Sequence, residues 1–559
     1  MTAPAHFTGL RGRSSEQKNQ RLPLLRRGAN AAALSTGSTV PDCFDFLFPT
    51  MISRFFRPAL IAVLLSGFSG AALAQTEAEG MFENVRRLAK ERAAKPYAAR
   101  SSTLAPFWAG LTYDDHRRIT FRPGKGLWQG ENRGYQLEFF HPGWVFPKTI
   151  EFHETAPDAS RTIDWNSDFF DYGELKVPEG TPRPDGYAGF RLMAPVDDPA
   201  SLSELAVFLG ASYFRALAPG LGMGTSARGL ALNPMRPQGE EFPDFIEWWV
   251  ERPASGAREI RAWALLDSPS VSGAYQFRIL AGRGTVMEIE TELTFRKDVE
   301  LIGIAPFSSM MWYSEYTQPK PQDYRPEVHD ADGLLIQFSE AEAAWRPLDT
   351  SKTVRHSVFS AGKFLGFGLA QRDRNFASYQ DMEANFHKRP SVWVQPVGEW
   401  PEGRINLIES PAGGDGSDNV VCFWEPKTRP KPGEPLRLAY RLEWLPEIAV
   451  PGLSRVVNSR RSHHVWPEGD SRPNDELFVV DFGPAPNPAD DETRPELSVE
   501  IDANAKILEQ NLQRNPDTGG WRVMLSILPA EKAVAVELGC RLVREGRPLS
   551  ERWTAQWKP

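Results

Sequence analysis

The stretch RPEVHDADGLL, residues 325–335, holds the densest group of side chains that could do chemistry. Glu327, His329, Asp330 and Asp332 lie close together in it, just before a glycine and an apolar pair. Such a group could bind a metal ion, transfer protons as a catalytic acid or base, or form a polar turn before a strand. These residues alone leave the three interpretations open.

The spacing within this stretch does not favour a metal loop. In the EF-hand pattern, oxygen ligands stand at loop positions 1, 3 and 5, and glycine stands at position 6. Counting from Asp330 puts Gly333 at position 4 and Leu334 at position 5, so the pattern fails. The histidines form no HExxH motif and no cluster with cysteine. We therefore expect no metal site and no cofactor.

Nucleophilic catalysis lacks a motif as well. No G-x-S-x-G sequence is present, and the nearest stretch, GMGTSARGL at residues 222–230, has the wrong spacing. The glycines of GLGMG favour a turn over a phosphate-binding loop, because the strand-to-helix context is missing. Carboxylates therefore remain as the candidates for catalysis.

Several carboxylates stand in polar stretches that are rich in aromatic residues. Cleavage of a glycosidic bond needs two carboxyl groups, one to donate a proton and one to activate water, and aromatic faces that contact the sugar rings. The chain supplies both kinds of side chain: Asp267, Asp330, Asp332, Asp373, Asp381 and Asp418, with Trp345, Trp393 and Trp424 nearby. Each Asp alone also fits a turn cap, and each Trp a core position, so composition does not choose the pair.

The elements that position these residues are predicted to be mostly strands. Short runs such as YQLEFFHPG, GYAGFRLMAP and GAYQFRIL are rich in β-branched or aromatic residues and are bounded by turn residues. Polar and apolar residues alternate over residues 286–295, which predicts a strand with one buried face. A helix is expected from Gln75 to about Lys95, where apolar residues recur at three- and four-residue spacing.

This pattern predicts an all-β protein. Residues 75–446 are expected to form a large N-terminal β-sandwich. About six short strands in residues 447–559 are expected to form a small immunoglobulin-like β-sandwich. Cys422 and Cys540 give no disulfide framework, and a chain of this size does not need one.

Residues 51–74 carry the pattern of a secretory signal peptide. Two arginines precede a short apolar stretch, and an A-x-A site ends at Ala74, after which we expect cleavage. Residues 1–50 are interpreted as a non-native extension ahead of a true start at Met51. Removing both segments changes the formal net charge from −8 to −13, which argues against nucleic acid as a partner. The mature chain is expected to be exported and to have no membrane span.

Several longer stretches are informative together: FENVRRLAKERAAKPY, LEFFHPG, GEEFPDFIEWWVERP, ALLDSPSVSGAYQF, RPEVHDADGLL, GFGLAQRDRNFASYQDMEANFHKRPSVWVQP and DNVVCFW. From about Phe82 to its end, the chain resembles the periplasmic glucan biosynthesis proteins G and D. The resemblance implies a periplasmic protein with a large β-sandwich of the carbohydrate-enzyme kind, followed by an immunoglobulin-like domain. It leaves open whether the chain is nearer type G or type D.

The resemblance also implies a function. The family works on osmoregulated periplasmic glucans, whose backbone is β-1,2-linked glucose, and it includes inverting β-1,2-glucan hydrolases. Asp418 is then the expected general acid and Asp330 the expected general base. The expected partner is a β-1,2-linked glucan, and the membrane glucan synthase is a further candidate. The alternative is a non-catalytic glucan-binding protein that guides backbone synthesis or branching, because the loops FSEAEAAWRPL and AGGDGS depart from the family pattern.

A glucan groove around this pair of aspartates needs polar and aromatic walls. Glu327, His329 and Asp332 are expected to support Asp330. The complete set of expected substrate-binding residues is Glu327, His329, Asp332, Tyr213, Arg215, Arg228, Glu241, Trp345, Arg372, Arg374, Asp381, Trp393 and Trp424. Inversion requires roughly 6.5–9.5 Å between the two catalytic carboxyl groups, which leaves room for a water molecule.

Overall fold

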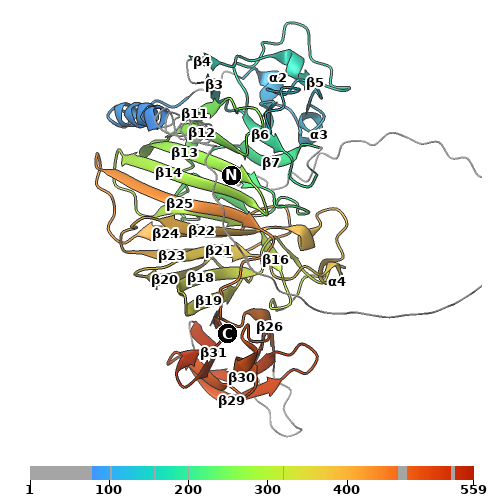
Figure 1. Ribbon diagram of the computed structural model, residues 1–559, viewed down its shortest axis with the longest axis vertical. Coiled ribbons are helices and arrows are strands. Elements are labelled where there is room, and N and C mark those ends of the chain that lie inside the picture. Colours follow the sequence, from blue (N-terminus) through green and yellow to red (C-terminus); the bar gives the residue numbers. More distant parts are fainter. Residues whose placement is uncertain are drawn as a thin grey trace, which may run out of the picture. The chain divides into compact units, whose positions relative to one another are not determined.

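The computed structural model describes residues 79–100, 104–156, 159–198, 201–318, 320–463, 475–530 and 535–558. The predicted N-terminal extension and signal peptide lie outside the described residues. Within those ranges, strands far outnumber helices (Figure 1), which confirms the prediction of an all-β protein. No helix of the described ranges is long and apolar enough to cross a membrane.

The first large sheet contains the strand that follows Asp418. In order of pairing, its strands are β2 (Gln136–Phe140), β6 (Gly189–Ala194), β7 (Ser203–Leu209), β8 (Tyr213–Ala216), β9 (Ser226–Arg228), β15 (Ile302–Ser309), β24 (Val420–Pro426), β23 (Gly403–Glu409) and β20 (Arg355–Ala361). An additional strand, β10 (Leu230–Leu232), pairs with β15. The pairing of β15 with both β9 and β24 brings distant parts of the chain together.

The second large sheet contains the strand that follows Asp332. Its main part, in order, is β19 (Glu342–Pro347), β18 (Gly333–Ser339), β21 (Gly366–Ala370), β22 (Ser391–Val397), β25 (Pro435–Leu445), β14 (Thr285–Phe295), β13 (Val271–Ala281), β12 (Glu259–Asp267), β11 (Asp244–Glu251), β3 (Glu151–Ala156) and β4 (Ala159–Thr162). Most neighbours in this part are antiparallel, and β3 pairs with β11 in parallel.

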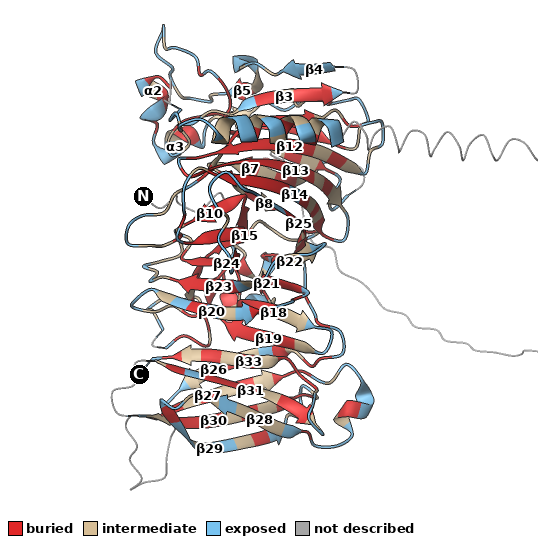
Figure 2. Cartoon of the chain, turned by 90° about the vertical axis from the view of Figure 1, so that its left-hand side faces the viewer, coloured by how far each residue is buried: buried red, intermediate tan, exposed pale blue. Residues whose placement is uncertain are grey.

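The two large sheets enclose one aromatic-rich core. Phe208 and Phe214 of the first sheet contact Phe277 of the second at ring-centroid distances of 5.7 and 5.6 Å. In β14, Met287 and Ile289 are buried, as the alternation over residues 286–295 predicted. Figure 2 shows how buried residues follow the strands of this body. Burial of each large apolar side chain stabilises the fold by about 1.5–3 kcal/mol, so this core holds the two sheets together.

Short elements surround the two large sheets. A helix covers residues 79–93, within the range that the sequence predicted, and its Phe82 and Val85 pack against Trp249 and Trp263. The other short elements are α2 (Pro106–Ala109), α3 (Tyr113–His116), β1 (Thr120–Phe121), η1 (Ser167–Phe169), β5 (Phe170–Asp171), β16 (Met311–Tyr313), β17 (Val328–His329), α4 (Phe376–Tyr379) and η2 (Phe386–Lys388). Of these, β16, β17, α4 and η2 lie beside the candidate site.

The C-terminal strands form two further layers. The first layer is a sheet in the order β26 (Val456–Ser462), β27 (Glu476–Phe482), β30 (Trp521–Pro529) and β29 (Ala505–Arg514). The second layer contains β28 (Glu496–Ile501), β31 (Val536–Arg544), β32 (Arg547–Pro548) and β33 (Arg552–Trp557), and η3 (Pro488–Asp491) precedes it. Phe478 and Trp553 pack between the two layers with rings 5.7 Å apart. Strand β33 pairs in parallel with β19, so the second large sheet continues into the C-terminal strands.

Candidate functional site

The two aspartates singled out by the sequence flank one short segment, Ser309–Met311, which joins β15 to β16. On one edge, the Asp330 N–H donates to the middle carbonyl of this segment at 2.9 Å. On the other edge, the N–H of Asn419, the residue after Asp418, donates to its first carbonyl at 3.0 Å. Successive residues of a strand direct their backbone groups to opposite sides, so the two aspartates lie on opposite edges. Two strand spacings, roughly 10 Å, therefore separate the backbones of Asp330 and Asn419, and Asp418 directly precedes Asn419.

Asn419 fixes the chain next to Asp418. Its buried side-chain amide accepts from the Met311 N–H at 2.8 Å and donates to the Met311 carbonyl at 2.9 Å. The same amide nitrogen donates to the Ser410 carbonyl at 2.8 Å. The side chain thus continues the hydrogen-bond ladder beyond the end of β24. A carboxylate at this position would lack the donor, which explains the amide.

Asp330 is buried against a cation. The Arg389 Nε lies 3.0 Å from the Asp330 Oδ1, with an angle that is poor for a hydrogen bond, so the contact is mainly electrostatic. The Arg389 guanidinium also packs over the Phe386 ring at 5.4 Å. The Asp330 Oδ1 is buried and has no hydrogen bond within the described residues, so it keeps the capacity to accept one.

His329 is a buried imidazolium. Its Nε2 lies 3.1 Å from the Glu327 Oε2, and its Nδ1 lies 3.1 Å from the Gln371 Oε1. The Gln371 amide nitrogen donates to the carbonyls of His329 and Phe386, so its oxygen must face the ring, and both ring nitrogens must donate. Burial opposes this charge, but the Asp332 and Glu327 carboxylates outweigh it and raise the pKa of His329 to about 9.

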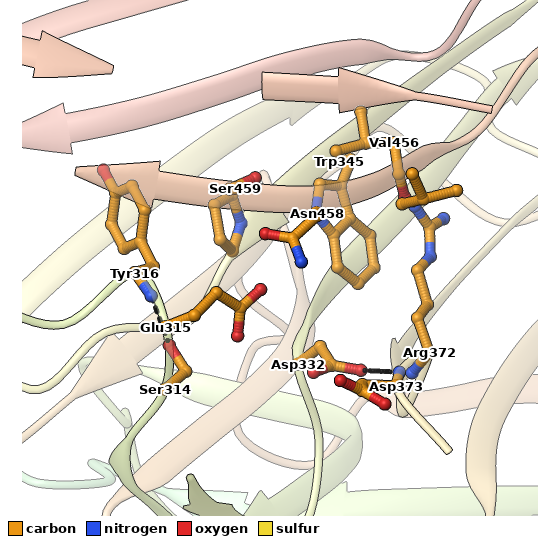
Figure 3. Close-up of a pocket in the computed structure, with 12 residues that line it drawn as sticks. Ser314, Glu315, Tyr316, Asp332, Trp345, Arg372, Asp373, Val456, Asn458 and Ser459 are labelled. Atoms are coloured by element: carbon orange, nitrogen blue, oxygen red, sulfur yellow. Dashed lines mark hydrogen bonds between the residues drawn. The ribbon is translucent and has the colours of Figure 1, made fainter. Parts of the chain in front are cut away.

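A small cavity adjoins this group (Figure 3), between the large sheets and β26. Burial, followed by the charges of Glu327 and Asp332, raises the pKa of Glu315 well above its usual range. The Glu315 Oε2, Asn458 Oδ1 and Ser459 Oγ are buried there without a hydrogen-bond partner in the described chain. The cavity has a volume of about 20 Å³, enough for about one water molecule.

Arg372 connects this cavity to the C-terminal strands. Its guanidinium makes two hydrogen bonds to Glu551, at 2.7 and 2.8 Å, and donates to the Val456 carbonyl. The same group lies 3.6 Å from the centroid of the Trp345 ring. Its backbone N–H donates to the Asp332 carboxylate. The shell around Asp330 is therefore held from both the large sheets and the C-terminal strands.

The surroundings of Asp418 come from the first large sheet. Arg228 lies over the Tyr213 ring at 4.6 Å, donates to the Ser308 Oγ at 2.7 Å and pairs with Glu240. Burial raises the pKa of Tyr213 to about 12; the nearby charge of Asp418 adds to this increase and Arg228 opposes it. The Tyr213 phenol is therefore protonated at neutral pH and can donate a hydrogen bond beside Asp418.

The glycine-rich loop ahead of Asp418, residues 411–417, is tied to the stretch that carries Asp330. The Arg325 Nη1 lies 2.8 Å from the Asp415 carboxylate of this loop. The same nitrogen lies 2.9 Å from the Asp381 carboxylate. Asp381 thus belongs to the site through Arg325. This guanidinium joins three segments that are distant in sequence.

Glu241 does not belong to this group. Its carboxylate accepts from the Ser268 hydroxyl at 2.7 Å and from the N–H and hydroxyl of Ser270 at 2.8 and 2.6 Å. These bonds cap the turn between β12 and β13. The carboxylate that pairs with Arg228 is Glu240, one residue earlier.

Four other expected groove residues have structural roles instead. Trp424 is fully buried in the core between the large sheets, and Trp393 is buried at 4% exposure in β22, so neither ring lines a surface groove. Both lie in strands that are covered on both faces. Arg374 donates to the Arg389 carbonyl at 2.8 Å and Arg215 donates to a serine hydroxyl of β9 at 2.6 Å. These two arginines support the loops and strands that carry the site.

The site also contains residues that the sequence analysis did not select. Arg325 and Asn419 adjoin selected residues, so their position in the sequence was a usable signal. Gln371 adjoins the selected Arg372, whereas Arg389 and Glu315 lie in other segments and reach Asp330 and His329 through the fold of the chain. No local pattern marks them.

Two groups in the described part of the chain have ligand atoms within 4.8 Å of one another, as a metal would require: Glu327, His329 and Asp332, and Glu151, His153 and Glu247. In the first group, both ring nitrogens of His329 already donate, to a carboxylate and to an amide oxygen. The second group lies on the partly exposed parallel pair of β3 and β11. The contacts of the first group are thus explained by an ion-pair network.

Comparisons with known proteins find relatives that match most of the chain. The family model "Periplasmic glucan biosynthesis protein, MdoG" matches residues 81–557. A glucans biosynthesis protein G from Ralstonia nicotianae is 40% identical over 497 residues, which cover 88% of this chain and 98% of that protein. Proteins of the same name from Pseudomonas paraeruginosa and Rhodopseudomonas palustris are 35% and 39% identical and cover 91% and 85% of this chain, and 99% and 93% of their own lengths.

Proposed function

Because the chain belongs to the periplasmic glucan biosynthesis protein MdoG family, we propose that it acts on a β-1,2-linked glucan backbone as an inverting hydrolase or transglycosylase. A role in glucan biosynthesis follows from the family itself. The bond type and the reaction are our proposal. The bond type is proposed from the family, and the reaction rests on one observation: the N–H groups of Asp330 and of Asn419, the residue after Asp418, donate to the adjacent carbonyls of Met310 and Ser309.

In this proposal, Asp418 donates its proton to the glycosidic oxygen that leaves. Asp330 accepts a proton from the water that attacks the anomeric carbon from the opposite face, which inverts the configuration. In transglycosylation, a sugar hydroxyl replaces that water. The cycle ends when the proton on Asp330 returns to solvent and Asp418 regains one. The separation of the two backbones is compatible with the carboxyl spacing of inverting enzymes, roughly 6.5–9.5 Å.

The surroundings of the two carboxyl groups suit these roles. Asp330 faces Arg389 and retains an oxygen without a hydrogen bond, as a group that positions a water requires. Asp418 is half-buried next to the Tyr213 phenol and ends a loop that could contact a sugar chain. The protonated phenol can donate to the sugar beside the bond that breaks.

The test is incubation of the purified mature protein with linear β-1,2-glucan. We expect shorter or rearranged glucans, and nuclear magnetic resonance of fresh products should show inverted anomers. Asp418→Asn should abolish product formation, whereas Asp517→Asn, the same change in an exposed C-terminal turn, should not. Equal turnover by wild type and Asp418→Asn would contradict the proposal. Binding without turnover would favour the non-catalytic glucan-binding alternative.

A further inference from the structure

Two large apolar side chains stand out by their exposure. Met382 is 80% exposed and Tyr324 is 76% exposed, the highest values for large apolar residues in the described ranges. Exposed aromatic and methionine side chains next to a polar cleft are typical of binding surfaces. Both residues adjoin the Arg325 contacts described above, since Tyr324 precedes Arg325 and Met382 follows Asp381.

Arg325 forms a rigid clamp beneath these side chains. Its Nε and Nη2 lie 2.9 and 3.0 Å from the Asp323 carboxylate, and its Nη1 contacts Asp381 and Asp415 at 2.9 and 2.8 Å. The side chain is only 11% exposed. Three carboxylates therefore hold one planar guanidinium, a geometry that fixes position as well as charge. We call Arg325 with Asp323, Asp381 and Asp415 the clamp.

The clamp also holds the backbone on both sides of Tyr324. The Arg325 N–H donates to the Asp323 carboxylate at 2.9 Å, and the Tyr313 hydroxyl donates to the Arg325 carbonyl at 2.9 Å. The Arg325 guanidinium lies 5.7 Å from the Tyr324 ring and 5.7 Å from the Trp312 ring. Asp381 accepts from two backbone N–H groups of the segment after Met382 at 2.8 and 2.6 Å. The exposed side chains are thus carried by ordered backbone.

The position of this surface favours a sugar chain as its occupant. Asp415 of the clamp lies three residues before Asp418, so the clamp holds the loop that leads to the candidate acid. A glucose ring presents an apolar C–H face, which packs on an aromatic ring, and a rim of hydroxyls, which bind carboxylates and water. A neutral polymer also fits a surface where three carboxylates surround one cation.

We propose that Tyr324, supported by Met382 and the clamp, is a binding subsite for glucose rings of the glucan beyond the point of cleavage. This inference rests on the proposed function, because it takes the glucan as the ligand. In it, the Tyr324 ring packs against one sugar face and Met382 covers an adjoining part of the chain. Tyr324 binds substrate and takes no part in proton transfer.

Calorimetric titration with linear β-1,2-glucan tests the subsite, with all variants made in an Asp418→Asn background so that no turnover occurs. Tyr324→Ala should weaken binding about tenfold, the loss of one aromatic contact. Tyr324→Phe should bind like the parent, because it keeps the ring. Met382→Ala should weaken binding by a few-fold. Thermal unfolding of each variant checks that the fold is unchanged.

Tyr113 supplies a matched control. It is 42% exposed and stacks with Arg117 at 5.8 Å, as Tyr324 does with Arg325, but it lies in α3. Tyr113→Ala should leave glucan binding unchanged. If the parent binds glucan and Tyr324→Ala binds equally well, the subsite is wrong while the proposed function stands. If the parent binds no glucan, the proposed function and the subsite fall together. If Tyr113→Ala weakens binding as much as Tyr324→Ala, the effect is not local and the subsite is again rejected.

Discussion

The two sides of the candidate site differ in how they hold their carboxyl group. Asp330 is buried, bonded through its backbone to the segment at Ser309–Met311, and paired with Arg389. Beside it, the His329 imidazolium joins a network of buried carboxyl groups. Asp418 is half-buried at the end of a glycine-rich loop and meets the sheet through its neighbour Asn419. One side is a closed charge network, and the other is a loop end.

This difference matches the unequal demands that the proposed inverting reaction would place on its acid and its base. The base must hold one small molecule, water, in one place, which favours a fixed and enclosed carboxylate. The acid must reach the leaving oxygen of a long chain that enters and departs, which favours a loop end that faces solvent. We infer that the Asp330 side sets the geometry of attack and that the Asp418 side receives the polymer.

The largest expected effects separate the two roles. Asp418→Ala and Asp330→Ala should each slow cleavage of natural glucan by about 10²–10⁴-fold. With an aryl β-glucoside whose leaving group needs no proton, Asp418→Ala should recover much of its rate, whereas Asp330→Ala should not. The measurement is the cleavage rate of each variant with natural glucan and with the aryl β-glucoside. Equal recovery in the two variants would show that the assignment of acid and base is wrong.

The next prediction concerns the buried ion pair between Arg389 and Asp330. Arg389→Met leaves the Asp330 carboxylate buried without its cation, and we expect a loss of about 3–5 kcal/mol in the free energy of unfolding. Adding Asp330→Asn to Arg389→Met should restore part of the lost free energy of unfolding. Guanidinium unfolding provides the measurement. Lys427→Met is the control: its pair with Glu402 is exposed on both sides, and the change should leave the free energy of unfolding nearly unchanged. A similar loss in the free energy of unfolding for Arg389→Met and Lys427→Met would contradict the predicted difference between the buried and the exposed ion pair.

A pH experiment sharpens the comparison on the same side. Folding raises the pKa of His329 from 6.5 to about 9, against burial and through Asp332, Glu327 and Glu315. Because the folded-state pKa is raised, this stabilisation is fully present below about pH 6.5 and is lost as pH rises through 9. It amounts to roughly 3 kcal/mol. His329→Gln should remove this part of the pH dependence of unfolding. If the free energy of unfolding depends on pH in the same way in the wild type and in His329→Gln, then His329 is not an imidazolium in the folded protein.

The smallest predicted effect concerns the contact between Asp415 of the glycine-rich loop and Arg325. Asp415→Asn removes one contact of Arg325, and the Asp415 side chain is 40% exposed, so unfolding should change by less than about 1 kcal/mol. The loop should be less ordered before the polymer binds, so KM should rise a few-fold while kcat stays unchanged. Steady-state kinetics on linear glucan separates the two parameters. A fall in kcat comparable to that of Asp418→Ala would mean that this loop contact takes part in the chemistry.

The sequence was sufficient for the strands and for the local group around Asp330. Alternation over residues 286–295 marked the buried face of β14, because that strand has one polar side. Glu327 and His329 lie beside Asp330 in the chain, so their contact needs no tertiary information. Gly333 has a physical reason that the sequence did not reveal, since a Cβ there would lie 2.3 Å from the Trp345 ring.

Other features depend on information that a single sequence does not carry. Trp393 and Trp424 lie in strands buried on both faces, so no alternation indicates which way a ring points. Glu240 and Glu241 are adjacent and chemically alike, and only the direction of the backbone decides which one meets Arg228. Arg389 reaches Asp330 through the fold of the loop before β22.

The parallel pairing of β33 with β19 has a consequence for the order of folding. Arg346 of β19 and Thr554 of β33, 208 residues apart in the chain, are joined by a hydrogen bond. Contacts of such long range form slowly because a large loop must close first. The Arg372–Glu551 contact near Asp332 has the same requirement. The contacts that support the site are thus complete only when the last strand of the chain has docked. A chain that ends before β33 would therefore lack part of the support for its site loops.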